Sequence, residues 1–131
     1  MNRPPGFARL SFCVVLAAWL LPTSARAADP QPDPWFGRDK ALHFGASALI
    51  ANVGYADAAL ATEDVRVRLA VGGGLALTAG VAKELWDLSG HGDASFRDLT
   101  WDVVGTATGL AVAAAIDWSI GKLRGRRVNA H

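Results

Sequence analysis

Three apolar segments follow one another after the first forty residues of the chain. They run from about 41 to 61, 69 to 86 and 99 to 116, and they are rich in Ala, Leu, Val and Gly. None of them alternates apolar and polar residues with a period of two, which favours helices over strands. The predicted fold is therefore all-α, a small bundle of three hydrophobic helices.

Whether these helices cross a membrane or form a water-soluble bundle is the main structural question. The uninterrupted apolar cores, 69–82 and 103–116, have fourteen residues each, a length equally typical of a buried helix in a soluble protein. A soluble helix, however, carries a broad polar face, and these segments carry none. Trp101 and Trp118 flank the third segment about 26 Å apart at 1.5 Å per residue, close to the thickness of the hydrocarbon layer. We therefore expect the helices to span a membrane.

The first 27 residues have the pattern of a secretory signal peptide. Arg3 and Arg9 lead into an apolar run over 10–21, and Ala25 and Ala27 provide the small residues of a cleavage site. Twelve apolar residues are short for a bilayer span. We expect cleavage after Ala27, with retention of the segment as a fourth helix as the alternative.

The mature chain is then expected to have three parts. Residues 28–38 are spaced by prolines and form an extended leader that cannot stay helical for long. Residues 39–121 hold the three-helix hydrophobic domain, and residues 122–131 form a basic tail.

Export and charge predict the same orientation. A cleaved export signal places residue 28 outside, so the first helix runs inward and the segment 83–98 is periplasmic. The loop 57–68 and the basic tail are then cytoplasmic, and both carry Arg or Lys, as the positive-inside rule requires. The predicted location is the bacterial inner membrane, with the lipid bilayer as partner and a polar face toward the periplasm.

Composition excludes several classes of function. The only cysteine, Cys13, lies inside the apolar run of the signal with Phe12 before it, so it is not a usable lipidation site, and the mature chain can form neither disulfides nor thiolate zinc sites. After residue 27, ten Lys and Arg face twelve Asp and Glu, a net charge of −2. We therefore expect no nucleic-acid partner, and no cofactor is implied.

Polar residues collect at the expected periplasmic ends of the helices. The members are Asp39, Lys40, His43, Lys83, Glu84, Asp87, Ser95, Asp98 and Asp102. Asp39 with His43, Lys83 with Asp87, and Asp98 with Asp102 stand four residues apart and share a helix face. The same faces continue through Gly73 and Gly80 and through Gly105 and Gly109, small residues that let helices approach closely. We therefore expect the charged ends to meet.

Several members also have purely structural interpretations. Lys83 would neutralise Asp87, and Glu84 would pair with Lys40, which makes a dehydrated end of the bundle tolerable.

The segment before the third helix has a similar interpretation. Ser95 followed by Asp98 fits a capping box for that helix. Asp93 and Arg97 are expected to be solvated charge, and Asp117 is expected to lie at the cytoplasmic interface without a special role.

His43 has three interpretations. It can be a neutral core histidine hydrogen-bonded to Asp39 or Asp102, or a general base or proton carrier held in one tautomer by a carboxylate. It can also be a metal ligand together with Glu84, Asp87 and Asp102. The metal interpretation is the weakest, because no second histidine stands at a ligand spacing.

The triplet Ser89-Gly90-His91 matches the central motif of membrane phosphatases of the phosphatidic-acid type. The flanking motifs of that family are absent, since no Arg-Pro follows the signal and the only later histidine is His131. We interpret the triplet as a chance match.

The order of the polar residues carries a family resemblance. Asp39-Lys40-x-x-His43-Phe44, then Lys83-Glu84-x-x-Asp87, then Ser95-x-x-Asp98-x-x-x-Asp102-x-x-Gly105-x-x-x-Gly109 resembles the YfiM-type periplasmic lipoprotein family. It is more distantly similar to VanZ-like small membrane proteins. The resemblance covers 35–118 and implies a bacterial cell-envelope protein with several hydrophobic helices and no established activity. The chain departs from the lipoprotein pattern because it lacks a lipidation site.

Three functions remain open. The first is an inner-membrane envelope protein whose polar residues have a structural role or bind a lipid headgroup or an envelope intermediate. The second is a membrane-embedded hydrolase or transferase in which His43 is the base, Asp102 or Asp39 orients it, and Glu84 is an acid or metal ligand, with water as the nucleophile. The third is a proton-coupled or an accessory channel subunit. The Gly105-x-x-x-Gly109 spacing also permits a homo-oligomer.

Overall fold

The structure, a computed structural model, describes residues 33–128. The expected signal peptide, the first part of the leader and residues 129–131 lie outside the described part. Three helices follow in order, α2 (Arg38–Ala58), α3 (Val65–Trp86) and α4 (Phe96–Val128), and a single wide π-helical turn (Asp87–His91) ends α3. Residues 33–128 contain no strand. The predictions of an all-α fold and of three helices are confirmed, and two of these helices, α3 and α4, are long and apolar.

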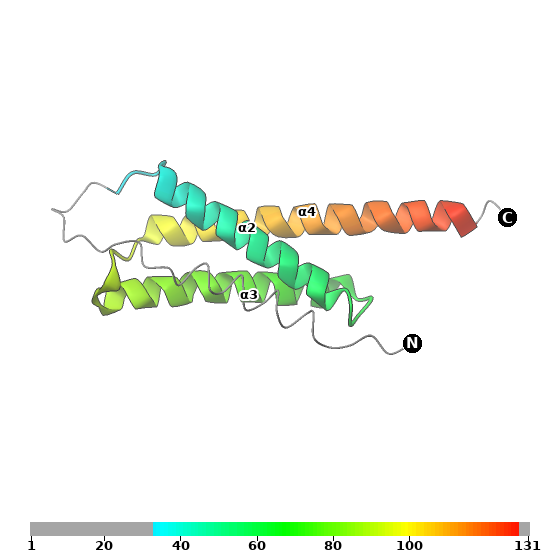
Figure 1. Ribbon diagram of the computed structural model, residues 1–131, viewed down its shortest axis with the longest axis horizontal. Coiled ribbons are helices and arrows are strands. Elements are labelled where there is room, and N and C mark those ends of the chain that lie inside the picture. The colour runs from blue at the N-terminus through cyan, green and yellow to red at the C-terminus, as the bar shows by residue number, and fades with distance from the viewer. Residues whose placement is uncertain (1–32, 129–131) are drawn as a thin grey trace.

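The helices form one bundle in which α2 crosses obliquely over both other helices. α3 and α4 run side by side in opposite directions, and α2 packs against each of them (Figure 1). The start of α2, the end of α3 and the start of α4 therefore lie at one end of the bundle. α4, with 33 residues, is about 50 Å long and continues past the other two helices at the opposite end (Figure 1).

Glycines bring the helix backbones into direct contact. A Cβ at Gly105 would lie 2.2 Å from the carbonyl oxygen of Phe44, and one at Gly109 would lie 2.2 Å from that of Ala48. Between α2 and α3 the close approach is at Gly72, where a Cβ would lie 2.5 Å from the carbonyl oxygen of Ala51. The expected packing roles of Gly105 and Gly109 are therefore confirmed. The neighbouring Gly73 has a looser fit, 3.3 Å from a side-chain methyl of Leu110.

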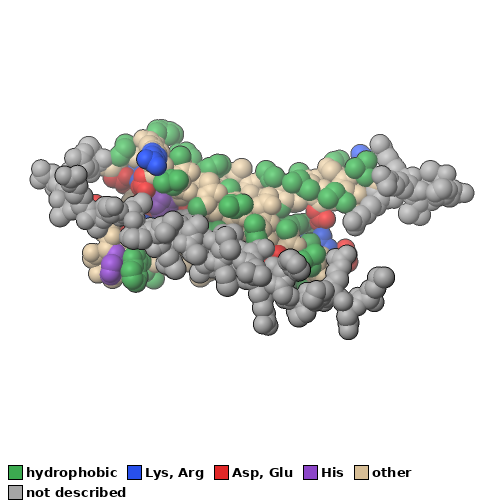
Figure 2. All heavy atoms as spheres, viewed as in Figure 1, with side chains coloured by type: hydrophobic (Ala, Val, Ile, Leu, Met, Phe, Trp, Pro, Cys, Tyr) green, Lys and Arg blue, Asp and Glu red, His purple; other side chains and the backbone are tan. Residues whose placement is uncertain are grey.

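The bundle is small and polar inside and apolar outside. The fully buried apolar residues are Ala51 and Ala76, with no accessible surface, whereas large side chains such as Leu49, Leu85 and Ile116 are more than half exposed. Hydrophobic side chains accordingly lie at many points along the coloured part of the bundle surface, between backbone atoms and small polar side chains (Figure 2). Two stretches, Val65–His91 and Phe96–Leu123, are long and apolar enough to cross a membrane.

The ends of α3 and α4 follow local sequence signals. Asp64 caps α3 by accepting a hydrogen bond from the amide of Arg66 (2.8 Å). The π-helical turn ends through Gly90, whose φ of +97° is a conformation that glycine adopts without steric cost. α4 runs to Val128, so the first residues of the expected basic tail are helical.

Candidate functional site

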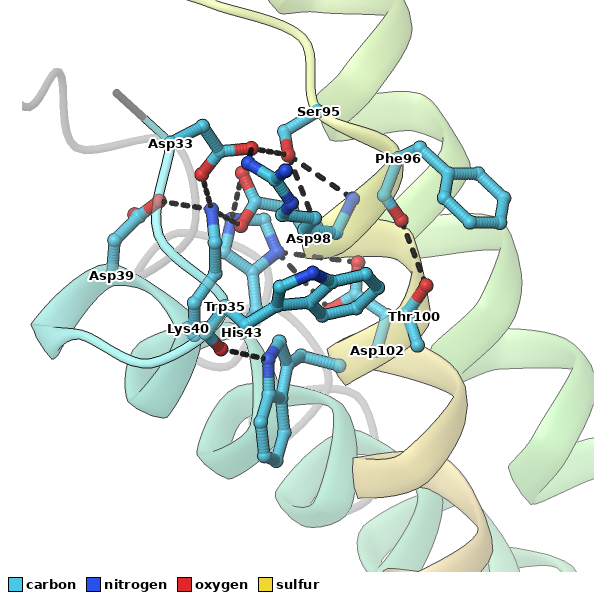
Figure 3. Close-up of polar contacts among 12 residues, drawn as sticks. Asp33, Trp35, Asp39, Lys40, His43, Ser95, Phe96, Asp98, Thr100 and Asp102 are labelled. Atoms are coloured by element: carbon cyan, nitrogen blue, oxygen red, sulfur yellow. Dashed lines mark hydrogen bonds and ion pairs between the residues drawn. The ribbon is translucent and has the colours of Figure 1, made fainter. Parts of the chain in front are cut away.

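Polar side chains from all three helices meet at the end of the bundle where α2 and α4 begin. Figure 3 shows most of them converging between these two helices. We call them the polar cluster: Asp33, Asp39, Lys40, His43, Ser47, Glu84, Ser95, Arg97, Asp98 and Asp102. Lys40, His43, Ser47, Glu84, Asp98 and Asp102 are all buried.

Asp102 stands at the centre of the polar cluster. Its carboxylate accepts a hydrogen bond from Ser47 Oγ (2.6 Å), and His43 Nδ1 lies 3.2 Å from each of its oxygens. A hydrogen bond from His43 to a carboxylate acceptor requires the tautomer that carries a proton on Nδ1. Asp102 is 1% exposed, which makes it the most deeply buried charged residue of the described chain. The predicted contact of His43 with Asp102 is confirmed, and the hydroxyl of Ser47 is a partner that the sequence did not indicate.

Asp98 extends this arrangement toward the surface. Its carboxylate pairs with Lys40 Nζ at 2.5 Å and lies 3.8 Å from His43 Nε2. Asp98 and Asp102 are one helical turn apart on α4, so the imidazole of His43 is placed between two carboxylates. Such an arrangement can hold a proton on the ring or pass it between neighbours.

Lys40 is the main positive charge of the polar cluster. Besides Asp98, its ammonium contacts Asp33 at 2.6 Å and Asp39 at 3.3 Å, although its side chain is only 5% exposed. Burial disfavours the charged form, but the hydrogen bonds to Asp33 and Asp98 outweigh this cost and raise the pKa of Lys40. Lys40 therefore stays an ammonium at every physiological pH.

A short irregular segment closes the polar cluster on its outer side. We call residues 33–37 the strap. Asp33 accepts a hydrogen bond from Ser95 Oγ (2.5 Å) and lies 3.5 Å from Arg97 Nη1. The carbonyl of Trp35 accepts a hydrogen bond from Trp101 Nε1 (2.8 Å). Hydrogen bonds from Lys40 and then Ser95 lower the pKa of Asp33.

The strap changes two expectations. Asp33 belongs to the Pro-rich leader and had no predicted role, because an irregular segment shows no periodicity that indicates what it touches. Arg97 was expected to be solvated charge, yet its guanidinium lies 5.3 Å above the ring of Trp35 and faces Asp33.

Glu84 is the contribution of α3. Its Oε2 accepts a hydrogen bond from the backbone amide of Ser95 (2.6 Å), and its Oε1 is buried without a hydrogen-bond partner among the described residues. The expected pairing of Glu84 with Lys40 is therefore wrong, since Lys40 pairs with three aspartates instead. The reason is register: α3 meets the loop before α4, whereas Lys40 faces α4 itself.

The predicted capping box at Ser95 is half correct. Ser95 Oγ accepts hydrogen bonds from the amides of Arg97 (3.1 Å) and Asp98 (3.4 Å), as a helix cap does. The reciprocal carboxylate on the Ser95 amide is that of Glu84 rather than that of Asp98. Asp98 is thereby left to pair with Lys40.

Lys83 and Asp87 form the predicted ion pair one turn apart on α3. Asp87 is 6% exposed, so it is buried at the end of this helix.

The groups that come close enough to share a cation differ from the expected set. The ligand atoms of Asp39, His43 and Asp98 lie within 4.8 Å of one another, whereas Glu84, Asp87 and Asp102 do not join that group. Lys40 already contacts both Asp39 and Asp98. Its ammonium thus already supplies a positive charge to two of the three groups that would hold a metal cation.

A second polar group closes the opposite end of the bundle. Arg68 of α3 is 4% exposed and donates hydrogen bonds to Asp117 of α4 (2.6 Å) and to the carbonyl of Thr62 (2.8 Å). The hydroxyl of Tyr55, on α2, donates to the same carboxylate of Asp117 (2.9 Å). Asp117 was expected to have no special role, but it joins all three helices.

The Ser89-Gly90-His91 triplet builds a local turn. Ser89 Oγ donates a hydrogen bond to the carbonyl of Trp86 (2.6 Å) and lies 2.9 Å from His91 Nδ1. The His91 ring stacks on Trp86 with 4.0 Å between the ring centroids.

No family profile, no curated protein and no solved structure shows a significant match to this chain. The resemblance to the YfiM-type family therefore stays a prediction.

Proposed function

We propose that this chain is a small inner-membrane protein of the bacterial cell envelope. In this proposal the apolar parts of α2, α3 and α4 cross the hydrocarbon layer. The polar cluster lies at the periplasmic interface and binds the polar headgroup of a lipid or of a lipid-linked envelope intermediate.

Large apolar side chains lie on the outside of the bundle, and this distribution supports the membrane location. Water-soluble proteins bury their large aliphatic side chains, whereas here Leu49, Leu85, Val103 and Ile116 are each about half exposed or more. The helix contacts depend instead on glycine and alanine, the residues enriched where helices meet in lipid. Two stretches of the bundle, Val65–His91 in α3 with its terminal turn and Phe96–Leu123 in α4, are long and apolar enough to cross the hydrocarbon layer.

The observation that carries the binding role is the dense set of buried charges at one end of this apolar bundle. Lys40, His43, Asp98 and Asp102 are each at most 4% exposed. Burying ionisable groups is costly even when they are paired, and well-packed apolar residues in their place are often equally or more stabilising. Such a set is therefore best explained by recognition of a polar group at the membrane surface.

Retained lipid tests this function. The full chain is purified in mild detergent and the lipid bound to it is identified by native mass spectrometry. Arg97→Gln removes a partly exposed charge of the polar cluster, and Arg66→Gln removes an exposed arginine from the opposite end of the bundle. We expect Arg97→Gln to lose most of the retained lipid and Arg66→Gln to keep it, at equal thermal stability. Equal retention in both variants would argue against a headgroup site at this end.

A second candidate is the membrane-embedded hydrolase or transferase. One observation favours it: the contact with Asp102 would orient His43 as a general base. It ranks second because His43 is only 4% exposed and Glu84, the proposed acid, is engaged by the Ser95 amide. Under this candidate His43→Gln folds normally and abolishes a phenotype, whereas under the binding role it changes lipid retention.

A further inference from the structure

Asp33 occupies a position that is built from hydrogen-bond donors. Its carboxylate contacts the ammonium of Lys40 (2.6 Å), the hydroxyl of Ser95 (2.5 Å) and the guanidinium of Arg97 (3.5 Å). Lys40 comes from α2, Ser95 lies directly before α4, and Arg97 lies in the first turn of α4; Figure 3 shows Lys40 and Ser95. An ammonium, a guanidinium and a hydroxyl around one carboxylate make up an anion-binding position.

The occupant of this position belongs to a short segment without regular secondary structure. The strap forms neither helix nor strand. Its backbone is tied to α4 by one hydrogen bond, from Trp101 Nε1 to the carbonyl of Trp35. The side chains of Asp33 and Arg97 are 38% and 37% exposed, so the anion position opens to the surface while Lys40 forms its buried floor.

We propose that Asp33 is a tethered substitute for an external anion, and that the singly charged phosphodiester of a lipid headgroup binds Lys40, Ser95 and Arg97 by displacing the strap. This inference rests on the proposed headgroup binding. It adds the part of the headgroup that is recognised and the residue that competes with it.

The charges around the position select a singly charged anion. Lys40 and Arg97 bring two positive charges, and Asp39 and Asp98, which both contact Lys40, bring two negative charges. When Asp33 leaves, the two positive and the two negative charges of these four groups cancel. One added negative charge then restores the net charge that the position has when Asp33 occupies it. A phosphomonoester dianion would place a further negative charge beside Asp39 and Asp98, which is unfavourable in a partly desolvated site.

The surroundings place a lipid headgroup within reach. Trp35 of the strap and Trp86 at the end of α3 are 47% and 56% exposed at this end of the bundle. Tryptophan side chains are enriched at the level of the headgroups. The anion position is therefore at the depth at which phosphodiesters of the outer leaflet lie in the proposed topology.

Titration of the purified full chain in detergent with dihexanoyl phosphatidylglycerol, a short-chain lipid with one phosphodiester charge, tests the proposal. Asp33→Asn removes the competing charge and keeps the size of the side chain. Asp93→Asn is the matched control, because Asp93 is an exposed acid in the loop just before α4. If the strap is closed about 90% of the time, Asp33→Asn tightens binding about tenfold. We expect less than a twofold change for Asp93→Asn.

Two further measurements identify the residues that bind the lipid and the chemical form of the ligand. Adding Arg97→Gln to Asp33→Asn should remove most of the gain. Inorganic phosphate should bind the Asp33→Asn variant much more weakly than the lipid does. An equal gain in Asp33→Asn and Asp93→Asn, or equal binding of inorganic phosphate and lipid, would overturn the proposal.

Failure of this inference is distinguishable from failure of the proposed function. If Arg97→Gln alone loses retained lipid but Asp33→Asn binds the lipid no more tightly than the unmodified chain, the headgroup site stands and the displacement is wrong. If Arg97→Gln and Arg66→Gln retain equal lipid, the headgroup site itself is wrong and the displacement falls with it.

Discussion

Gly80 of α3 lies directly against the carboxylate of Asp102 on α4. A Cβ at position 80 would come within 2.6 Å of Asp102 Oδ2. The missing side chain at Gly80 is therefore what allows Asp102 to be buried among three helices while it still faces His43 and Ser47. A packing residue and a candidate site residue thus depend on each other.

Gly80→Ala should disturb the polar cluster without adding or removing a charge. The new methyl group overlaps the carboxylate of Asp102, and overpacking of this kind costs about 1–3 kcal/mol. Gly74→Ala, on the same helix, is the control, because a Cβ there meets nothing within 4 Å. Unfolding in mixed detergent micelles measures both. Equal stability of the two variants would show that Asp102 does not lie against position 80.

Gly109→Ala should separate α2 from α4. The added Cβ would lie 2.2 Å from the carbonyl oxygen of Ala48, and a helix backbone cannot yield as a flexible side chain does. We expect a loss of unfolding free energy larger than that of Gly80→Ala, together with lower accumulation of the protein in membranes. Gly121→Ala, with open space around its Cβ, is the matched control. A Gly109→Ala variant as stable as this control would contradict the close crossing of the two helices.

His43 and Asp102 should behave as an energetically coupled pair. Their contact is buried, and the substitutions His43→Ala and Asp102→Asn should therefore not be additive. A double-mutant cycle on thermal or chemical unfolding should give a coupling of about 0.5–3 kcal/mol. Additive losses would mean that the two side chains do not interact in the folded protein.

Arg68 should matter more than its neighbour Arg66. Arg68 is buried and joins α3 to Asp117 of α4, whereas Arg66 is exposed on the same helix. Arg68→Gln should lower the melting temperature clearly, and Arg66→Gln should leave it almost unchanged. Both variants remove one positive charge from the same end of the bundle. An effect of the lost charge on the orientation in the membrane would therefore appear equally in both variants. An equal fall in melting temperature would therefore argue against the ion pair.

Short-range features of the chain could be predicted because they depend on helix geometry alone. The i, i+4 spacing placed Lys83 beside Asp87, and the glycine spacing in α4 indicated a close helix contact. The cap at Ser95 also follows from local sequence. These predictions need only the period of an α-helix.

Long-range partners could not be predicted, because they depend on how one helix is rotated against another. The sequence correctly predicted that Lys40 and Glu84 lie at the same end of the bundle. The pairing expected between them is wrong, because the rotation of α2 turns Lys40 toward Asp98. Asp33 and Arg68 reach partners that are 62 and 49 residues away, with no motif to connect them.

The end of α4 shows that a fall in hydropathy does not predict where a helix ends. The apolar run stops at Ile116, and the expected domain ended at residue 121, but the helix continues to Val128. Falling hydropathy marks where a segment leaves an apolar environment, not where its backbone stops being helical. Leu, Lys and Arg are good helix formers, so the polar continuation extends the helix.

The orientation of the bundle decides which side of the membrane the polar cluster faces in the proposed function, and labelling of single cysteines measures it. In a Cys13→Ala background, His91→Cys, Ala61→Cys and Gly125→Cys place one exposed thiol each on the end that carries the polar cluster, on the α2–α3 loop and near the end of α4. A membrane-impermeant maleimide added to intact cells should label position 91 and should reach positions 61 and 125 only after the membrane is opened. Labelling of position 91 only from the cytoplasmic side would contradict the account.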